Sequence, residues 1–267
     1  MSNSSDVQFG GSIPGIYDQH LGPLLFKPYA AEVARRASAW QPKHILEVAA
    51  GTGLVTVELA YDCPEARIVA TDLNPEMLHV AKRRTSNLRE RVQVQQADAQ
   101  ALPFEEGAFD LVVCQFGIMF FPEKVKANSE ARRVLQPGGR YLLVIWDRLE
   151  HNPAAQQVHS AVAGLFPEDP PQFLGRTPFG YFDPAGIERD LLAAGFTDIQ
   201  FETVALESLA SAQPEDASLG MVEGTPLRAE IEARDPTMLE RAEQAARAAL
   251  SRHFPRALSA HMVTAIR

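Results

Sequence analysis

The sequence predicts an α/β protein with a Rossmann-like, doubly wound sheet whose strands are mostly parallel and carry helices on both faces. Two observations support this fold class. Short apolar segments alternate with helical patterns as far as residue 147, which is typical of parallel strands joined by crossover helices. A turn of small residues, Ala49 to Gly53, follows the first apolar segment, and such turns let a ligand approach the sheet edge closely.

Seven segments have the pattern of strands. Five precede the point where the pattern loosens, and they cover 44–49, 66–72, 91–98, 109–116 and 139–147. Two more follow, at 197–206 and 258–267. Asn74 before Pro75 is typical of a helix start, and Pro137-Gly138-Gly139 indicates the end of the preceding helix.

The chain is expected to form a single domain over residues 1–267, with four parts in sequence order. Its proline-rich stretch "FPEDPPQFLGRTPFGYFDP" is compatible with neither a regular helix nor a central strand, so we expect a cover there. The expected parts are an N-terminal helical cover at 1–40, a cofactor-binding core at 41–147, a lid or substrate segment at 148–183, and the remaining sheet at 184–267 with a helical insertion near 213–253.

Composition limits the classes of function. Of the 267 residues, 46% are hydrophobic and 22% charged, which suits one globular domain without a membrane span. The N-terminus lacks the pattern of a secretory signal, so a cytoplasmic protein is expected. A net charge of -9 disfavours nucleic acid and favours a small substrate. Two cysteines, Cys63 and Cys114, suggest no metal site; the oligomeric state is not predicted.

The small-residue turn distinguishes between three kinds of binding loop. A phosphate-binding P-loop requires Gly-Lys-Ser/Thr, which is absent, and a dinucleotide loop starting at Gly51 requires glycine where Thr56 stands. The segment from Glu47 to Gly53 instead has the form acidic-x-x-x-Gly-x-Gly. It resembles motif I of the class I S-adenosylmethionine-dependent methyltransferases, although Ala49 replaces a glycine often found there.

The resemblance to that family continues through residues 44–147. "VATDLNPEML", "QQADAQALPF", "FDLVVCQFGIMFF" and "RVLQPGGRYLLVIW" are similar to its following segments, in the same order. "YDQHLGPLLFKPYA" and "LLAAGFTDIQFETV" resemble the small-molecule branch that includes the ubiquinone and menaquinone biosynthesis methyltransferases. The resemblance implies a seven-stranded sheet with an antiparallel last strand. It also implies S-adenosylmethionine as cofactor, with S-adenosylhomocysteine as product.

Three acidic residues are candidates for binding that cofactor. Asp72 follows the turn by about 20 residues, where a carboxylate can accept hydrogen bonds from ribose hydroxyls; the alternative is a cap for the helix at Pro75. Asp98 with Ala99 is a candidate for binding adenine, or an ordinary turn. Glu47 lies inside an apolar strand, where it either meets the cofactor's ammonium or makes a structural hydrogen bond.

Other candidates are apolar or lie at the reacting end. Leu73 and Met77 could flank the adenine, as could Phe104, although core packing is the alternative for the last two. Gln115 and Phe116 follow the fourth strand and should face the methyl donor. The expected cofactor-binding set is Glu47, Ala49, Gly51, Gly53, Asp72, Leu73, Met77, Asp98, Ala99, Gln115 and Phe116.

The acceptor site is predicted as an aromatic wall, with no catalytic residue assigned. Its candidates, for which core packing is the alternative, are Tyr17, Phe26, Phe116, Met119, Trp146 and Phe173. His20 and His151 are candidate general bases or plain surface histidines. "CQFG" at 114–117 differs from the Asp/Asn-Pro-Pro-Tyr/Phe of adenine N-methylating enzymes, which argues against a nucleobase acceptor.

We therefore predict methyl transfer to a small, apolar or aromatic metabolite by in-line displacement. Alignment of the two reactants and exclusion of water would supply much of the acceleration. Two rival functions stay open at this point. One is a nicotinamide-dependent oxidoreductase on a similar sheet, and the other is a protein that binds S-adenosylmethionine without transferring its methyl group.

Overall fold

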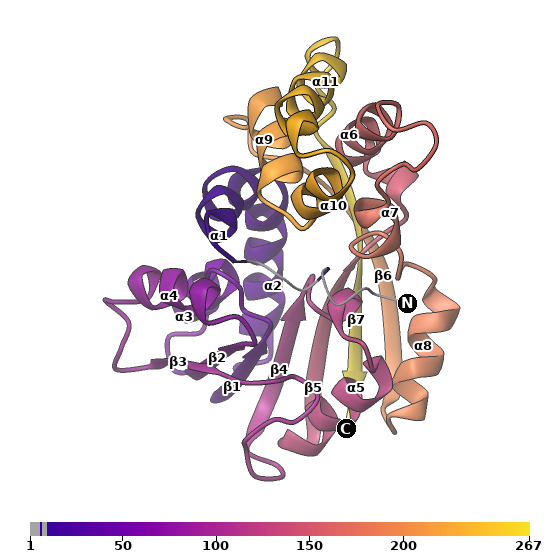
Figure 1. The fold of residues 1–267 in the computed structure, drawn as a ribbon. Coiled ribbons are helices and arrows are strands. Elements are labelled where there is room, and N and C mark those ends of the chain that lie inside the picture. The colour runs from indigo at the N-terminus through magenta and orange to yellow at the C-terminus, as the bar shows by residue number, and fades with distance from the viewer. Residues whose placement is uncertain (1–5, 7–9) are drawn as a thin grey trace.

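The computed structural model describes Asp6 and residues 10–267, which contain one seven-stranded sheet of order β3-β2-β1-β4-β5-β7-β6 (Figure 1). Strand β7 is antiparallel to both β5 and β6, and the other pairs are parallel. The predicted fold class is therefore confirmed. The strands are β1 His44–Val48, β2 Arg67–Asp72, β3 Val92–Gln96, β4 Phe109–Gln115, β5 Leu135–Trp146, β6 Thr197–Glu207 and β7 Ala257–Ile266.

The central strands are apolar because both of their faces are covered. In β1, Ile45 pairs with Ile68 of β2 and Leu111 of β4, and all three side chains are almost fully buried. The strand order reverses between β1 and β4, so the crossover connections leave these two strands in opposite directions. This switch point is where open α/β sheets bind their ligands.

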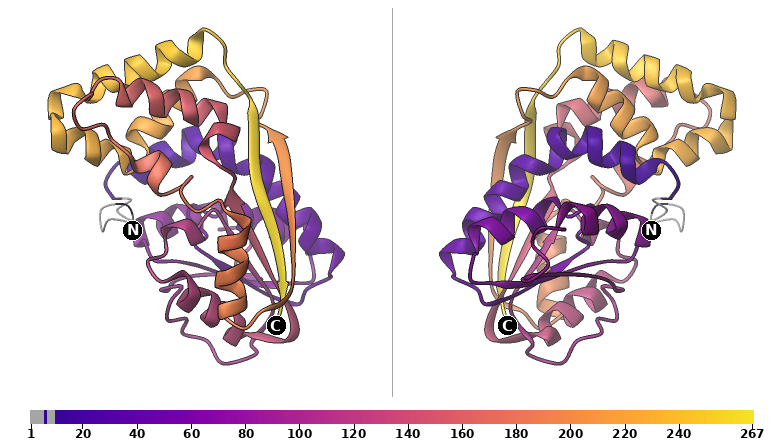
Figure 2. Two further views of the ribbon diagram at one scale, coloured as in Figure 1. Left: turned by 90° about the vertical axis from the view of Figure 1, so that its right-hand side faces the viewer. Right: turned by 90° about the vertical axis from the view of Figure 1, so that its left-hand side faces the viewer.

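Helices cover the two faces of the sheet. On one face, α2 (Lys27–Ala39) packs against α3 (Leu54–Asp62), with α4 (Pro75–Arg84) beside them; on the other, α5 (Lys124–Val134) packs against α8 (Pro184–Ala193) (Figures 1 and 2). Helix α4 starts as predicted, because the Asn74 side chain accepts hydrogen bonds from the backbone N–H groups of Glu76 and Met77.

A separate layer of helices stands above the carboxyl ends of the strands (Figure 2). Helix α11 packs on α6 and α9, and α9 packs on the N-terminal π-helix η2. The region 213–253 is helical, as predicted, but it is divided among α9, α10, η5 and α11. The helices of this layer are α1 Ile13–Ile16, η2 Tyr17–Phe26, α6 Pro153–Ala163, α7 Phe173–Arg176, α9 Pro214–Glu223, α10 Leu227–Arg234, η5 Pro236–Met238 and α11 Leu239–Ser251.

Two details differ from the sequence prediction. Helix α5 ends before the Pro-Gly-Gly turn, and Leu135 already pairs with Phe109; residues 136–139 then bulge out, with φ +77° at Gly138, before pairing resumes. Helix α6, which begins with proline at its first turn, was not predicted. Short 3₁₀ turns lie at Ile118–Phe120 (η3) and Leu149–His151 (η4).

No helix within residues 10–267 combines the length and apolar character needed to cross a membrane.

Candidate functional site

A cavity of about 580 Å³ opens at the carboxyl ends of β1, β2 and β4. Its volume lies in the range of small-molecule and cofactor sites. Six chain segments contribute to the walls: Gly10, the π-helix η2, the turn after β1, the end of β2 and the residues after it, the loop after β3, and the end of β4 and the residues after it. The cavity therefore occupies the switch point of the sheet.

The turn after β1 is tight because three of its residues have positive φ. Gly51 has φ +55°, and a Cβ added there would meet no atom within 4 Å, so its backbone faces open space in the cavity wall. Gly53 has φ +81°, and a Cβ there would come within 3.2 Å of the backbone of Ala81 in α4. Glycine at 51 thus leaves room for a ligand, whereas glycine at 53 permits close helix packing.

Ala49 adopts φ +54°, an uncommon conformation for a residue with a Cβ. Gly117 compensates for it at the end of β4: a Cβ added to Gly117 would lie 2.5 Å from the Cβ of Ala49 and 2.9 Å from the Sγ of Cys114. Phe116, beside Gly117, also has φ +54°. A residue with positive φ therefore lies at the tip of β1 and another at the tip of β4, and both line the cavity.

Asp72 closes the turn from the adjacent strand. Its Oδ2 accepts a hydrogen bond of 2.8 Å from the backbone N–H of Gly51, and its Oδ1 accepts one of 2.8 Å from that of Asn74. Burial raises the pKa of this carboxyl, and those N–H donors oppose the shift. The cap of α4 is provided by Asn74, so Asp72 is left to hold the turn and to face the cavity. Its predicted ribose contact stays a prediction.

Glu47 lies at the end of the cavity nearest the sheet. Its side chain is almost fully buried, and the hydroxyl of Thr56 donates a hydrogen bond of 2.6 Å to Oε2. Burial raises its pKa to about 8, and the nearby Asp72 adds to the shift. The structural hydrogen bond considered for Glu47 exists, and the carboxyl also lines the cavity. Its predicted contact with an ammonium group stays a prediction.

The residues expected around adenine form one wall. Leu73 is 56% exposed although apolar, and Met77 is buried; both line the cavity, together with Asp98 and Ala99. The Oδ1 of Asp98 accepts a hydrogen bond of 2.8 Å from the backbone N–H of Gln100. Phe104 instead makes an edge contact with Phe109, at 5.1 Å between centroids, and is not among the lining residues.

The opposite wall is aromatic. Tyr17 and Phe26 of η2 stack at 4.8 Å between ring centroids and line the cavity with Phe116. Gln115 donates a hydrogen bond of 3.3 Å from Nε2 to the carbonyl of Phe26, and its Oε1 is buried with no hydrogen-bond partner in the described chain. Residues not predicted from the sequence also line the cavity: Phe120, Phe121 and Pro122 follow β4, whereas Gly10 and Gln100 lie near Glu76 and Asp98.

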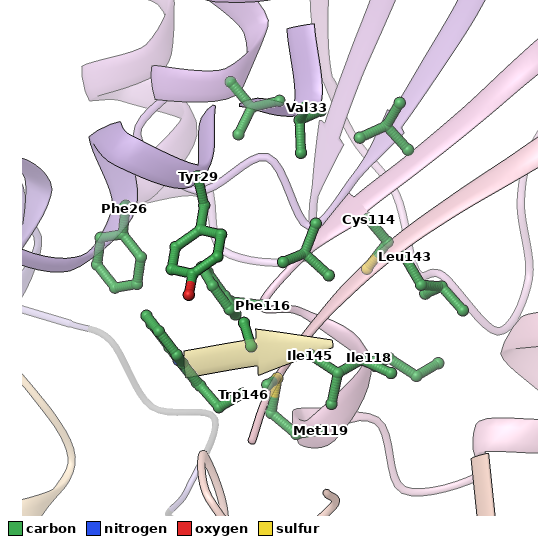
Figure 3. Packing of buried hydrophobic residues seen from close by; sticks show 14 of the residues in the cluster. Phe26, Tyr29, Val33, Cys114, Phe116, Ile118, Met119, Leu143, Ile145 and Trp146 are labelled. Atoms are coloured by element: carbon green, nitrogen blue, oxygen red, sulfur yellow. The ribbon is translucent and has the colours of Figure 1, made fainter. Parts of the chain in front are cut away.

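Three other candidates for the acceptor wall support it from behind. Trp146 stacks on Phe116 with 3.7 Å between centroids and an interplanar angle of 6°, while Met119 and Phe173 are buried. Figure 3 shows Trp146, Phe116 and Phe26 gathered with Tyr29. Trp146, Met119 and Phe173 do not line the cavity. These three side chains therefore pack in the core, which was the alternative considered for them.

The two candidate general bases are paired with carboxylates outside the cavity lining. The Nδ1 of His20 lies 2.9 Å from Asp216 of α9, and the Nδ1 of His151 lies 2.7 Å from Asp147. No histidine, lysine or arginine is among the described residues that line the cavity. No group of His, Cys, Asp and Glu suited to a metal ion occurs within residue 6 and residues 10–267.

Charge therefore divides the cavity. We call the region around Glu47, Asp72, Glu76 and Asp98 the acidic end, and the region around Tyr17, Phe26, Gln115 and Phe116 the aromatic end. The sheet order, the glycine turn and the carboxylate after β2 together define a Rossmann-like protein with a nucleotide-type cofactor site at the switch point.

Comparison with known proteins identifies the family. A family model described as "Methyltransferase domain" matches residues 45–139. The demethylmenaquinone methyltransferase of Thermus thermophilus is 34% identical over 170 residues, which cover 58% of this chain and 75% of that protein. The enzyme of the same name from Deinococcus radiodurans is 35% identical over 133 residues, covering 50% of this chain and only 53% of that protein.

Solved structures agree at the level of the fold. The Bacillus subtilis protein YcgJ is 21% identical with a TM-score of 0.57, over 90% of this chain and 98% of that one. A Haemonchus contortus phosphoethanolamine N-methyltransferase, in complex with S-adenosylmethionine, is 18% identical with a TM-score of 0.60, over 95% of this chain and 56% of that one. The chain belongs to the class I S-adenosylmethionine-dependent methyltransferases.

Proposed function

We propose that the protein transfers the methyl group of S-adenosylmethionine to a small, neutral, aromatic metabolite by in-line displacement. The observation that carries this proposal is the single continuous cavity of about 580 Å³ that joins the motif I turn to the aromatic end. Relatives named demethylmenaquinone methyltransferases support a quinone-like acceptor. The nicotinamide alternative gains no support, because Thr56 occupies the place of its third glycine and is bonded to Glu47.

The acidic end suits the cofactor. S-adenosylmethionine supplies a methyl group on a positively charged sulfur that is its own leaving group. Each oxygen of Asp72 receives one backbone hydrogen bond and keeps a lone pair for a ribose hydroxyl. Asp98 and Ala99 would receive the adenine against Leu73, whose exposed apolar side chain needs a partner. Glu47 would face the ammonium group.

Charge also narrows the class of acceptor. The lining described here holds four acidic side chains and no basic one, so a phosphorylated or carboxylated acceptor would find no counter-charge among these side chains. The Haemonchus neighbour is named for phosphoethanolamine, and this cavity offers nothing for such a phosphate. A neutral ring that stacks on Tyr17, Phe26 or Phe116 is compatible with both the charge and the apolar surface.

Gln115 would position the acceptor. Its amide nitrogen is held by the carbonyl of Phe26, which orients the amide and leaves the buried oxygen Oε1 to accept a hydrogen bond. A hydroxyl group on the aromatic ring would supply the donor. The aromatic wall and the amide together would align the ring with the methyl group and exclude water, which is what this reaction requires.

The N-terminal helices and residues 148–183 are proposed as covers of this site. Residues Tyr17 and Phe26 support the first of these roles, since both line the cavity. Support for the second is indirect, through Phe173 of α7, whose ring lies 6.4 Å from that of Phe120 between centroids.

Labelled methyl transfer tests the proposed function. The protein would be incubated with methyl-labelled S-adenosylmethionine and, separately, hydroxylated aromatic compounds, phosphorylated amines, tRNA, DNA and protein extract. Label is expected in the first class alone. The variant Gln115→Leu should lower kcat/KM by about tenfold, for loss of one hydrogen bond to the acceptor, and should weaken the binding of S-adenosylhomocysteine by less than that. Label in nucleic acid without a small-molecule product would contradict the proposal.

A further inference from the structure

Glu47 is a buried carboxyl without a positive partner. It stands at the end of β1, is 2% exposed, and receives one hydrogen bond, from the Thr56 hydroxyl. Arg84 contacts the same turn, but its guanidinium donates to the carbonyl of Thr52 and to Asp18. An ionised carboxylate with one neutral donor is costly in such a place, because burial removes its water without replacing the hydration.

The groups that face Glu47 do not supply the missing charge. Asp72, from the end of β2, is a second carboxylate in the same cavity and disfavours a charge on Glu47. Cys114, from β4, is a thiol whose pKa burial raises to about 12, so it is neutral. The Thr56 hydroxyl favours the ionised form through its hydrogen bond, and so does the N-terminal end of α3, which begins at Leu54. Burial and the nearby Asp72 outweigh these effects, and the pKa of Glu47 is raised to about 8.

We infer that Glu47 is protonated in the empty site and releases its proton to solvent when the cationic amino group of the cofactor enters the acidic end. This inference rests on the proposed function, and it adds the release of one proton to the binding of the cofactor. The ammonium of the ligand replaces the proton as the positive charge beside the carboxylate. Loading of the donor is then coupled to pH, and ligands without the amino group do not trigger the release.

Calorimetry counts the released proton directly. S-adenosylhomocysteine would be titrated at pH 7 in phosphate and in Tris, whose different ionisation enthalpies turn proton release into a difference in heat. With a pKa of about 8, most of Glu47 is protonated at pH 7, so the release should approach one proton for each ligand bound. 5′-Methylthioadenosine carries the nucleoside and the sulfur without the amino acid, and it should release none.

Variants assign the proton to Glu47. Glu47→Gln keeps the size and the contact with Thr56 but has no proton to lose, so its count should fall to zero. Glu76→Gln removes another carboxylate that lines the cavity and should leave the count unchanged. Thr56→Val removes a hydrogen bond that lowers the pKa of Glu47, so at pH 8 it should release more protons than the native protein.

A second measurement needs no ligand. The pKa of Glu47 is about 8 in the folded protein against 4.5 for the ordinary group, so the folded state binds its proton more tightly than the unfolded chain does. This contribution to stability is therefore full below about pH 4.5 and is lost as pH rises toward 8. The Tm of the native protein should fall across that window relative to Glu47→Gln.

The outcomes are distinct. No proton release by the native protein, or equal release by Glu47→Gln, would overturn this inference while binding and methyl transfer remained intact. Release triggered equally by 5′-methylthioadenosine would also overturn it, since the amino group would then have no part. Failure of S-adenosylhomocysteine to bind at all would instead overturn the proposed function, and this inference with it.

Discussion

The acidic end and the aromatic end of the cavity are assembled in different ways. At the acidic end, Glu47, Gly51 and Asp72 come from two neighbouring strands and the turn between sheet and helix, and backbone hydrogen bonds hold them. At the aromatic end, Gln115 contacts Phe26 across 89 positions of sequence, and the wall depends on a π-helix packed over the sheet. The difference predicts a rigid donor site and a more adaptable acceptor site.

The largest effect is expected at Gly51 of the acidic end. Gly51→Val places a branched side chain in the cavity and forces it to adopt φ +55°, so affinity for S-adenosylhomocysteine should fall at least about 100-fold, roughly 3 kcal/mol. Gly138→Val is the matched control, since Gly138 also has positive φ and open space but lies in the β5 bulge. Calorimetry should show normal binding for the control; normal binding by Gly51→Val would show that motif I had been misread.

Asp72→Ala should have the next largest effect. It removes the acceptor proposed for two ribose hydroxyls and leaves the N–H groups of Gly51 and Asn74 without their partner. The expected loss of affinity for S-adenosylhomocysteine is about 1.5 to 3 kcal/mol, with a lower Tm. Asp72→Asn keeps one acceptor oxygen and should lie between. Unchanged affinity in the alanine variant would remove the ribose assignment.

Substitutions at Ala49 and Gly117 test how rigid the cavity is where the turn after β1 meets the residues after β4. Gly117→Ala should destabilise the protein by about 1 to 3 kcal/mol, because the two Cβ atoms would lie 2.5 Å apart. In the double variant with Ala49→Gly, which removes that clash and the strain of a positive φ at alanine, part of the loss should be recovered, because the new Cβ would still lie 2.9 Å from the Sγ of Cys114. Urea unfolding would give the free energy of unfolding of the native protein, the two single variants and the double variant. Strictly additive effects would mean that the contact between positions 49 and 117 does not cause the loss of stability.

The smallest effect is expected in the covers. Hydrogen exchange with S-adenosylhomocysteine should slow both in residues 10–26 and in residues 148–183. The slowing should be larger in the first segment, since Tyr17 and Phe26 line the cavity and no described residue of 148–183 does. Equal exchange with and without ligand in both segments would reduce them to ordinary surface structure.

The two ends also differ in how well the sequence predicts them. Strands β1 to β5 and the turn after β1 have local patterns, so their places follow from short segments. The aromatic wall has no such local pattern. Phe120 and Phe121 line the cavity from a 3₁₀ turn after β4, and nothing distinctive in the sequence marks that turn. Trp146 resembles a wall residue in sequence but lies behind Phe116 in the structure.

Contacts between distant parts of the chain were not predicted at either end of the cavity or in its cover. The hydrogen bond from Gly51 to Asp72 joins residues 21 positions apart, and the contact of His20 with Asp216 joins residues 196 positions apart. Both depend on how elements pack, which local propensity does not encode. Helix α6 was not predicted because the proline-rich stretch that follows it made the whole segment resemble a loop.

The most direct test of the account is the structure of the protein bound to S-adenosylhomocysteine. We predict the ribose at Asp72, the adenine between Leu73 and Asp98, and the ammonium beside Glu47, with the sulfur pointing to the aromatic end at Gln115 and Phe116. An S-adenosylhomocysteine molecule that lies elsewhere, or that occupies the cavity with its ribose away from Asp72 and its sulfur away from the aromatic wall, would contradict the division of the cavity into a donor end and an acceptor end.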